Sequence, residues 1–257
     1  MASIFVMTPG PQATVEFRGR GNDPVARKKD RKFNIMKKYQ SVLTLGLCAG
    51  ALCAGTARAE TGFYAGADVG GLLTLDTRVK EFTGPVGSDT KMKLDPGIRV
   101  GLHGGYKLTD WFSVEGETGV MGNNIKSIPG ASLDGDASLA NVPFLLNARF
   151  ELPHGRCPIT PYFGGGAGGS ATVLSFEHHI DFNGNRLRGT DSDVVFAYQA
   201  FGGIRYAIND HMDVGVEYHY FATTGASYSV DGVGTPNKIG LAGVQSHAIT
   251  AAFNYRF

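Results

Sequence analysis

The last residues of the chain constrain its fold more than any other segment. Residues 244–257 alternate between bulky apolar and polar or small side chains. Because successive side chains of a strand point to opposite faces, Ile249, Phe253, Tyr255 and Phe257 share one face. A globular sheet rarely ends on its most hydrophobic strand, whereas a barrel in lipid needs a last strand that closes against the first. The pattern favours a transmembrane β-barrel and predicts that Phe253, Tyr255 and Phe257 belong to its closing and assembly strand.

The first 59 residues predict a leader and not folded structure. Residues 1–35 are basic and poor in apolar side chains, which is typical of a disordered tail. From Met36 onward the chain has two lysines, an apolar run and an Ala-Arg-Ala motif, which are the three parts of a secretory signal peptide. We therefore expect a signal peptide over 36–59, cleavage between Ala59 and Glu60, and a non-native or disordered extension over 1–35. The start of translation, Met1 or Met36, stays open.

Removal of residues 1–59 leaves an acidic chain with little cysteine. It has 14 Lys and Arg against 20 Asp and Glu, a net charge of −6, and Cys157 as its one cysteine. An internal disulfide is therefore excluded, and Cys157 is either a free thiol or a partner in an intermolecular disulfide. No remaining run approaches the roughly 18 apolar residues of a spanning helix, so any membrane insertion must use strands.

Eight segments alternate with a period of two, which predicts eight strands. They cover residues 62–71, 94–107, 112–121, 140–152, 159–173, 194–208, 213–222 and 244–257. Three connections are short, and the other four, 72–93, 122–139, 174–193 and 223–243, are long and rich in Gly, Ser, Asp and Asn. Outer-membrane barrels alternate short periplasmic turns with long outer loops in this way. Residues 60–257 are thus predicted to form one all-β domain, an eight-stranded antiparallel up-and-down transmembrane β-barrel.

Four motifs resemble the opacity-type and OmpA-type small outer-membrane barrels. They are the opening Gly62–Gly70, the Gly105–Trp111 hairpin, Val216–Tyr220 and the aromatic carboxy terminus. The resemblance extends over essentially all of residues 60–257 and includes no catalytic signature. It implies a location in the bacterial outer membrane and a structural or surface-interaction role, adhesin-like or opacity-like. The alternative is a small porin-like channel or a carrier for small solutes, for which interior glycines such as Gly164, Gly166 and Gly168 would leave a passage.

Charged residues on the faces opposite the apolar rows are the best site candidates. They are predicted to face the lumen and comprise Arg99, Glu115, Glu117, Arg149, Arg205 and Glu217. The interior of an eight-stranded barrel is only wide enough to be filled by side chains, and buried charges are tolerated when paired. These residues therefore form either a self-satisfied polar plug or a gate whose pairs exchange partners to open an ion path.

Aromatic residues gather toward both ends of the predicted strands, which is typical of two interfacial girdles. The set near the short turns comprises Phe63, Tyr106, Trp111, Phe112, Phe150, Phe163, Tyr206, Tyr255 and Phe257, and the farther set comprises Phe144, Phe196, Tyr198, Tyr218 and Tyr220. A ligand-stacking surface is the alternative.

The remaining motifs predict no metal, cofactor or enzymatic site. The run from Glu177 to Asp181 includes two histidines but has no established metal-ligand spacing. Asp181 also begins a calcium-like loop, yet its twelfth position is Ser192 where a Glu is required. Ser246 and His247 suggest a hydrolase, but neighbours in a strand point apart.

The expected partners follow from the predicted location. They are outer-membrane lipids, the barrel assembly machinery and an extracellular partner bound through the long loops. No nucleic acid is expected, because nothing in the sequence supports the basic run at 18–32 as a binding element. The identity of the loop partner, conduction through the lumen and the oligomeric state stay open.

Overall fold

The computed structural model describes residues 62–82, 90–129, 131–133, 137–152, 158–182, 185–232 and 237–257. The chain divides into two compact units, 1–41 and 42–257, and every described residue belongs to the second. The predicted extension, the signal peptide with its cleavage site at Ala59 and Glu60, and Cys157 all lie outside the described residues. Within those residues, no helix is long and apolar enough to cross a membrane.

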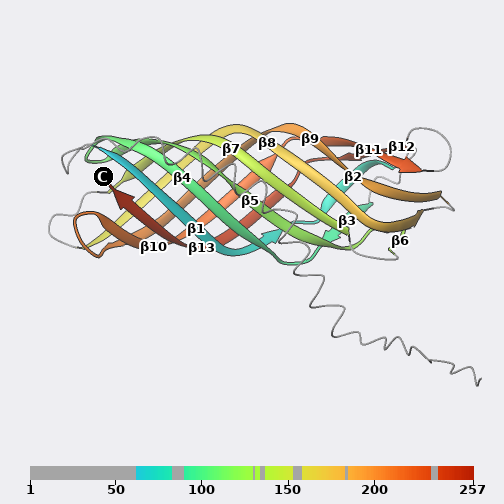
Figure 1. The fold of residues 1–257 in the computed structure, drawn as a ribbon, viewed down its shortest axis with the longest axis horizontal. Helices are drawn as coiled ribbons and strands as arrows, with labels where there is room; N and C mark the ends of the chain where they lie inside the picture. The colour runs from blue at the N-terminus through green and yellow to red at the C-terminus, as the bar shows by residue number, and fades with distance from the viewer. Residues whose placement is uncertain are drawn as a thin grey trace, which may run out of the picture. The chain divides into compact units, whose positions relative to one another are not determined.

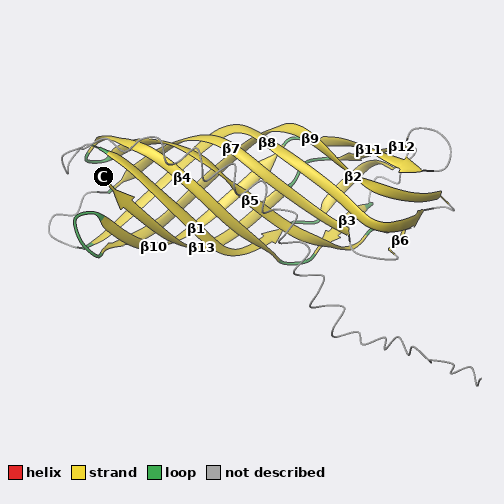
Figure 2. Cartoon of the chain, in the orientation of Figure 1, coloured by secondary structure: helices red, strands yellow, loops and turns green. Residues whose placement is uncertain are grey.

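Eight long strands form a closed antiparallel barrel, as the sequence predicted (Figures 1 and 2). Each pairs with the next around the wall, and the last pairs with the first. In order they are β1 (Phe63–Thr74), β4 (Gly97–Thr109), β5 (Phe112–Ser127), β7 (Ala137–Glu151), β8 (Ile159–Phe182), β9 (Asn185–Ala207), β10 (Met212–Thr223) and β13 (Gln245–Arg256).

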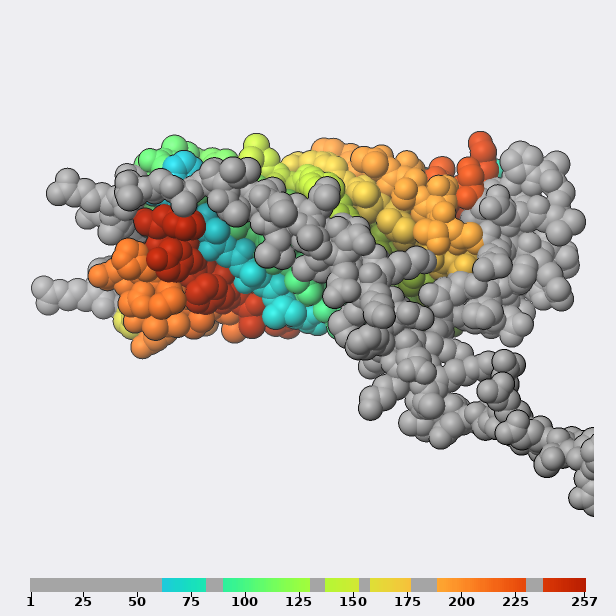
Figure 3. Space-filling model, viewed as in Figure 1, coloured from blue at the N-terminus to red at the C-terminus, as the bar shows by residue number. Residues whose placement is uncertain are grey.

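The carboxy-terminal strand closes the barrel. Phe253 of β13 lies opposite Ala67 of β1 on one side and Val214 of β10 on the other. The N–H of Phe257 donates to the carbonyl of Phe63 at 3.0 Å, so the closure continues to the last residue. In the space-filling view the carboxy-terminal residues, in red, lie against the β1 residues, in cyan (Figure 3). Closure satisfies the backbone groups that an open edge would leave unpaired in lipid.

The short turns and both ends of the barrel chain lie at one end. The N–H of Lys107, near the β4–β5 turn, donates to the carbonyl of Gly62 at 2.9 Å, and the N–H of Arg256 donates to the carbonyl of His211 in the β9–β10 turn at 2.7 Å. In that turn Asn209 Oδ1 accepts from two following N–H groups, a pattern that favours a tight reversal. Outer-membrane barrels place short turns at the periplasmic side, so this is the periplasmic end.

At the outer end, strands replace the long loops that the sequence predicted. They are β2 (Thr77–Phe82), β3 (Lys91–Leu94), β6 (Ala131–Leu133), β11 (Ala226–Gly232) and β12 (Asn237–Leu241). The pairings β9–β11–β12–β2–β3–β5 continue the wall, and β6 pairs with β8. We call these five strands, with β5 from Asn124, β8 from Leu174 and β9 up to Val195, the outer extension. The loop prediction was wrong because these short runs also alternate: Val79 points inward while Arg78 and Lys80 are exposed.

The outward rows of the eight long strands are strongly apolar. Ile98, Leu146, Val194 and Ile249 are 63, 64, 76 and 65% exposed, with many other large apolar side chains above 40%. A water-soluble protein rarely exposes so large a contiguous apolar surface. In hydrocarbon the same surface is favourable, which fits the apolar band of a transmembrane barrel.

Candidate functional site

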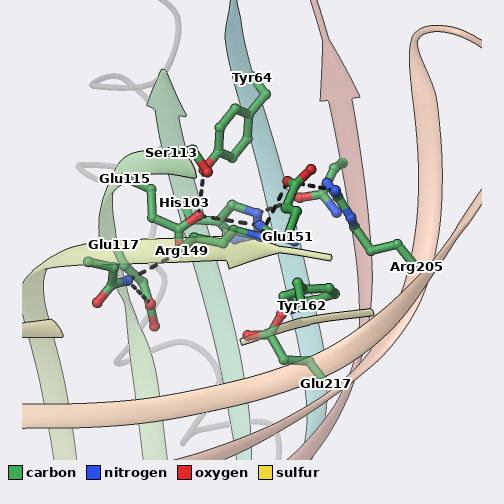
Figure 4. Close-up of polar contacts among 12 residues, drawn as sticks. Tyr64, His103, Ser113, Glu115, Glu117, Arg149, Glu151, Tyr162, Arg205 and Glu217 are labelled. Carbon is green, nitrogen blue, oxygen red and sulfur yellow. Dashed lines mark hydrogen bonds and ion pairs between the residues drawn. The ribbon is translucent and has the colours of Figure 1, made fainter. Parts of the chain in front are cut away.

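The barrel interior holds the charged residues that the sequence singled out. All six, Arg99, Glu115, Glu117, Arg149, Arg205 and Glu217, lie inside, each at most 9% exposed. They join further polar side chains into one network, of which Figure 4 shows the part around Arg149. We call this set, with the partners named below, the charged network.

Arg99 lies at the end of the charged network that is nearest the outer extension. Its Nε lies 3.0 Å from Oδ1 of Asp68, and its Nη2 donates to Oε1 of Glu117. The other oxygen of Glu117 accepts from Asn147 Nδ2 at 2.7 Å and from Gln199. A guanidinium between two carboxylates, one of them held by two amides, meets the condition under which buried charge is tolerated.

Arg149 occupies the centre. Its Nη1 lies 3.4 Å from Oε2 of Glu115, which also accepts from the Tyr64 hydroxyl at 2.8 Å. The guanidinium carbon is 4.0 Å from the ring centroid of Tyr162, within the range of a cation–π interaction. The Tyr162 hydroxyl in turn donates to Glu217 at 2.5 Å. One arginine thus links strands β1, β5, β7, β8 and β10 across the lumen.

A second group of charges fills the periplasmic mouth. Arg205 lies 2.6 Å from Glu151 and 3.6 Å from Asp213, Lys107 lies 3.2 Å from Glu151, and Arg256 lies 3.6 Å from Asp213. The cavity here is about 30 Å³, room for no more than a few waters. The mouth is filled by side chains.

The structure brings together only part of the predicted set. Arg99 pairs with Glu117 and Arg149 pairs with Glu115, but Arg205 and Glu217 find partners outside it. Glu217 lies 2.8 Å from His219 Nε2. The residues that sequence reasoning missed are Asp68, Lys107, Glu151, Asp213, His219, Tyr64, Tyr162, Asn147 and Gln199. The alternation of β1 and β7 would have found Asp68 and Glu151, which share the inward face with charges already named.

Two of the three β8 glycines considered above, Gly164 and Gly166, face space that other side chains occupy. A Cβ atom at Gly166 would overlap the side chain of Asn147, and one at Gly164 would overlap the ring of Phe201. Both glycines therefore make room for neighbouring side chains.

The outer part of the interior is apolar. One cluster of buried side chains fills the outer extension: Val79, Met92, Ile125, Ile128, Ala137, Leu139, Leu174, Phe176, Val195, Ala226, Tyr228, Ile239, Leu241 and Val244. Burial raises the pKa of Tyr228, so its hydroxyl stays neutral among them. A smaller cluster containing Leu72, Met121 and Phe221 lies between this outer apolar core and the charged network.

The wall of the outer extension has a seam between β9 and β11. In the described chain the β9–β10 ladder ends at Ala197↔Thr223, and the β9–β11 ladder comprises only Arg188↔Asp231 and Leu187↔Gly232. Two carboxylates bridge the interval: Asp193 accepts from the N–H of Ser227 at 2.9 Å, and Asp191 accepts from that of Ser229 at 2.5 Å. Side-chain acceptors thus replace backbone carbonyls along the seam.

The other candidates do not form a site in the described residues. Ser246 is buried, while His247 points outward and its Nδ1 lies 2.7 Å from the Tyr218 hydroxyl, so the two are not a catalytic pair. No three His, Cys, Asp or Glu side chains are placed to hold a metal, within the part of the chain that is described. The side chains from Glu177 to Asp181 are outside that part.

The outward aromatics form contacts at both levels. Near the short turns, Phe63 packs on Tyr106 at 4.8 Å between ring centroids, and Phe150 packs between Phe112 and Phe163 at 5.2 and 5.5 Å. Farther along, Phe196, Tyr198 and Tyr220 follow one another at 6.4 Å. Continuous outward rows at two depths are the arrangement of interfacial girdles.

Comparison with solved structures gives the same fold. OprG from Pseudomonas aeruginosa matches with 20% identity and a TM-score of 0.51, over 78% of this chain and 97% of that chain. Neisserial surface protein A matches with 16% identity, a TM-score of 0.46 and coverage of 76% and 97%. The outer membrane protease OmpT from Escherichia coli matches with 10% identity, a TM-score of 0.44 and coverage of 77% and 95%. At 20% identity, the match to OprG shows a shared fold and nothing about function.

The sequence itself matches a family model. No curated protein matches the chain significantly. The model of the outer membrane protein β-barrel domain, however, matches residues 42–257, which include every strand described above. The chain therefore belongs to the outer membrane protein β-barrel family, and its location is the bacterial outer membrane.

Proposed function

We propose that this barrel is closed to ions and acts as a structural and surface-interaction protein, with the outer extension as its contact surface. The observation that supports this most is the filled interior: ion-paired side chains occupy the periplasmic mouth and the centre, and apolar side chains occupy the outer end. Neither layer offers a passing ion a continuous polar path.

Energetics favour the plug over the gate. Removing one partner of a buried ion pair typically costs about 3–5 kcal/mol. Arg99 and Arg149 each contact more than one carboxylate or aromatic ring, so moving either one disrupts several interactions together. A gate opened by thermal motion requires ion pairs that break at a lower free-energy cost than these.

The strand-built outer extension suits a contact surface. Paired strands hold exposed side chains in fixed positions, and a preordered surface loses less conformational entropy on binding than flexible loops do. A catalytic role is not part of the proposal, because Ser246 and His247, the one suggestive pair in the sequence, lie on opposite faces of β13.

Planar bilayers test the closed interior. The full chain, purified and folded, should give no discrete conductance steps. A double variant, Arg99→Ala with Arg149→Ala, is the positive control, since removing both guanidinium groups opens space in the polar layer. Steady steps from the unaltered protein would contradict the proposal and support a porin-like channel.

Whole-cell binding tests the contact surface. Cells that display the barrel should bind a host-cell or matrix target more than cells without it, and exchanging residues 83–89, between β2 and β3, and 233–236, between β11 and β12, should abolish the gain. The matched control exchanges residues 153–157, between β7 and β8. Equal binding by all strains across a broad panel of targets would contradict the surface-interaction role, and only the structural role would remain.

A carrier for small apolar molecules is the second candidate. The outer apolar core favours it, because an apolar molecule that entered from the outer end would meet an apolar lining there. Uptake of a labelled alkane by cells with and without the barrel tests this role. Filling the core with Ala137→Phe should reduce the uptake of a carrier, and equal uptake with and without the barrel would rule it out.

A further inference from the structure

Unpaired cations gather on one wall of the outer extension. Arg78 and Lys80 lie on β2, Lys91 and Lys93 on β3, Lys126 on β5 and Lys238 on β12, four strands that adjoin one another, and all six side chains are exposed. None of them forms an ion pair within the described residues. Three carboxylates, Asp76, Glu81 and Asp95, share this wall without pairing with them.

The four cations closest to the membrane-spanning part of the barrel are tightly grouped. Arg78 and Lys91 are directly opposite each other in the β2–β3 ladder. Lys93 lies opposite Ser127, and the register shift beside it leaves Lys126 as the extra residue of β5. Directly opposite residues have Cβ atoms about 5 Å apart, and like charges at that separation destabilise a sheet. We call Arg78, Lys91, Lys93 and Lys126 the basic cluster.

The depth of the basic cluster matches the lipid headgroups. The apolar outward rows end at Leu75, 48% exposed, next to β2, and at Ile98, 63% exposed, on β4. With about 3.3 Å per residue and strands tilted by roughly 40°, Arg78 and Lys93 lie about 8 and 13 Å beyond those residues along the membrane normal. Long basic side chains can also bend back toward the interface.

The inward faces mark the same boundary. On β5 the inward residues change from Glu117 through Met121 to Ile125, and the outward residues change from Val120 to Lys126. Apolar inside and polar outside is the arrangement of a protein wall in water. The basic cluster therefore stands where hydrocarbon gives way to the polar surface of the membrane.

We propose that the basic cluster binds the phosphate groups of outer-leaflet glycolipid, the diphosphorylated lipid A that faces this wall. Four cations at headgroup depth supply charge-assisted hydrogen bonds to phosphate oxygens. The bound phosphates neutralise the like-charge contact between Arg78 and Lys91, which nothing in the described protein relieves. Binding would fix one wall of the barrel against the lipid.

Titration with lipid A tests the proposal. The full chain, folded in a zwitterionic detergent, is titrated with fluorescent diphosphoryl lipid A, with its dephosphorylated form and with inorganic phosphate. Diphosphoryl lipid A should bind, and its binding should weaken as salt increases. The dephosphorylated lipid and inorganic phosphate should compete with it poorly. Equal binding of the dephosphorylated lipid would overturn the proposal, as would saturation by inorganic phosphate at the same phosphate concentration.

Two double variants with equal charge change locate the site. Lys91→Gln with Lys93→Gln should weaken lipid A binding about thirtyfold, since each cation near an anionic surface contributes roughly a factor of five. Lys80→Gln with Lys238→Gln, farther from the lipid boundary, should weaken it less than about threefold by the same reasoning. All four side chains are exposed, and heat-modified gel mobility verifies that each variant is folded. Equal losses in the two variants would show general charge attraction and contradict a site at the basic cluster.

Discussion

The two halves of this barrel are built with opposite polarity. In the spanning half, charges such as Arg99 and Arg149 fill the interior while Ile98, Leu146 and Ile249 face outward. In the outer extension, Met92 and Leu174 fill the interior while lysines face outward. The same strands carry both arrangements, so the surrounding medium, hydrocarbon in one half and water in the other, determines which side chains each face can accept.

The comparison also separates two ways of filling a barrel. Burial of an apolar side chain needs no specific partner. A buried charge, in contrast, is stable only with its partners in place. Single substitutions should therefore have larger effects in the charged network than in the outer apolar core.

The largest effect is expected for Arg149→Ala. It leaves Glu115 without its cation, removes the cation–π contact with Tyr162 and should reduce the free energy of unfolding by about 3–5 kcal/mol. Urea unfolding of the barrel in lipid vesicles, followed by tryptophan fluorescence, measures it. Arg256→Ala, at the partly exposed mouth, is the control and should cost less than about 1 kcal/mol. A loss below 1 kcal/mol at Arg149 would remove the contrast between the halves.

Leu174→Ala should have a somewhat smaller effect in the outer apolar core. The side chain is 1% exposed, and its truncation leaves a cavity that typically costs about 2–5 kcal/mol. Because the outer extension lies beyond the bilayer, hydrogen exchange should accelerate there first, while the amides of β1 and β13 near the short turns stay protected. Equal acceleration in both halves would show that they unfold as one unit.

Gly166→Ala should cost about 1–3 kcal/mol, since the added methyl group displaces the Asn147 side chain from its place beside Glu117. The same unfolding assay measures it. Gly104→Ala is the matched control, because an added Cβ there meets nothing closer than 3.7 Å. If both substitutions reduced the free energy of unfolding by the same small amount, the interior beside Gly166 would have free space, which contradicts a lumen filled by side chains.

The smallest effect is expected at the seam. Asp193→Ala removes the acceptor of the Ser227 N–H, a net loss of about 1 kcal/mol, so exchange of that amide should accelerate about fivefold. Val230 lies in the same strand and is opposite Asn237 of β12, and its amide should change little. An unchanged rate at Ser227 would mean that the carboxylate does not hold the seam.

Much of the fold was predictable because lipid imposes a simple rule on each strand. Period-two alternation located all eight long strands, and the aromatic terminus identified β13 as the closing strand. The rule failed in all four predicted long loops: β5, β8 and β9 run on into 122–139 and 174–193, and short strands form in 72–93 and 223–243. There the breaks at Leu75–Asp76 and Thr224–Gly225 shorten each alternating run, and a run of five to seven residues rich in polar side chains is not distinguishable from a loop.

The site was predictable in its location but not in its pairing. Alternation places Arg205 and Glu217 inside, but which carboxylate reaches Arg205 depends on the stagger between strands. That stagger puts Glu151, two strands away around the wall, 2.6 Å from the Arg205 guanidinium. The outer apolar core was missed because all of its members except Val195 and Val244 come from segments interpreted as loops.

Spin labelling along β5 tests the change of polarity most directly. Single labels at the outward positions Val114, Thr118, Val120, Asn124 and Lys126, in the folded full chain in lipid vesicles, report access to oxygen, which is enriched in hydrocarbon, and to a nickel chelate, which is confined to water. We expect oxygen access to dominate from Val114 to Val120 and nickel access to dominate at Asn124 and Lys126. Nickel access throughout, or no change between Val120 and Lys126, would contradict a barrel whose spanning half faces hydrocarbon and whose outer extension faces water.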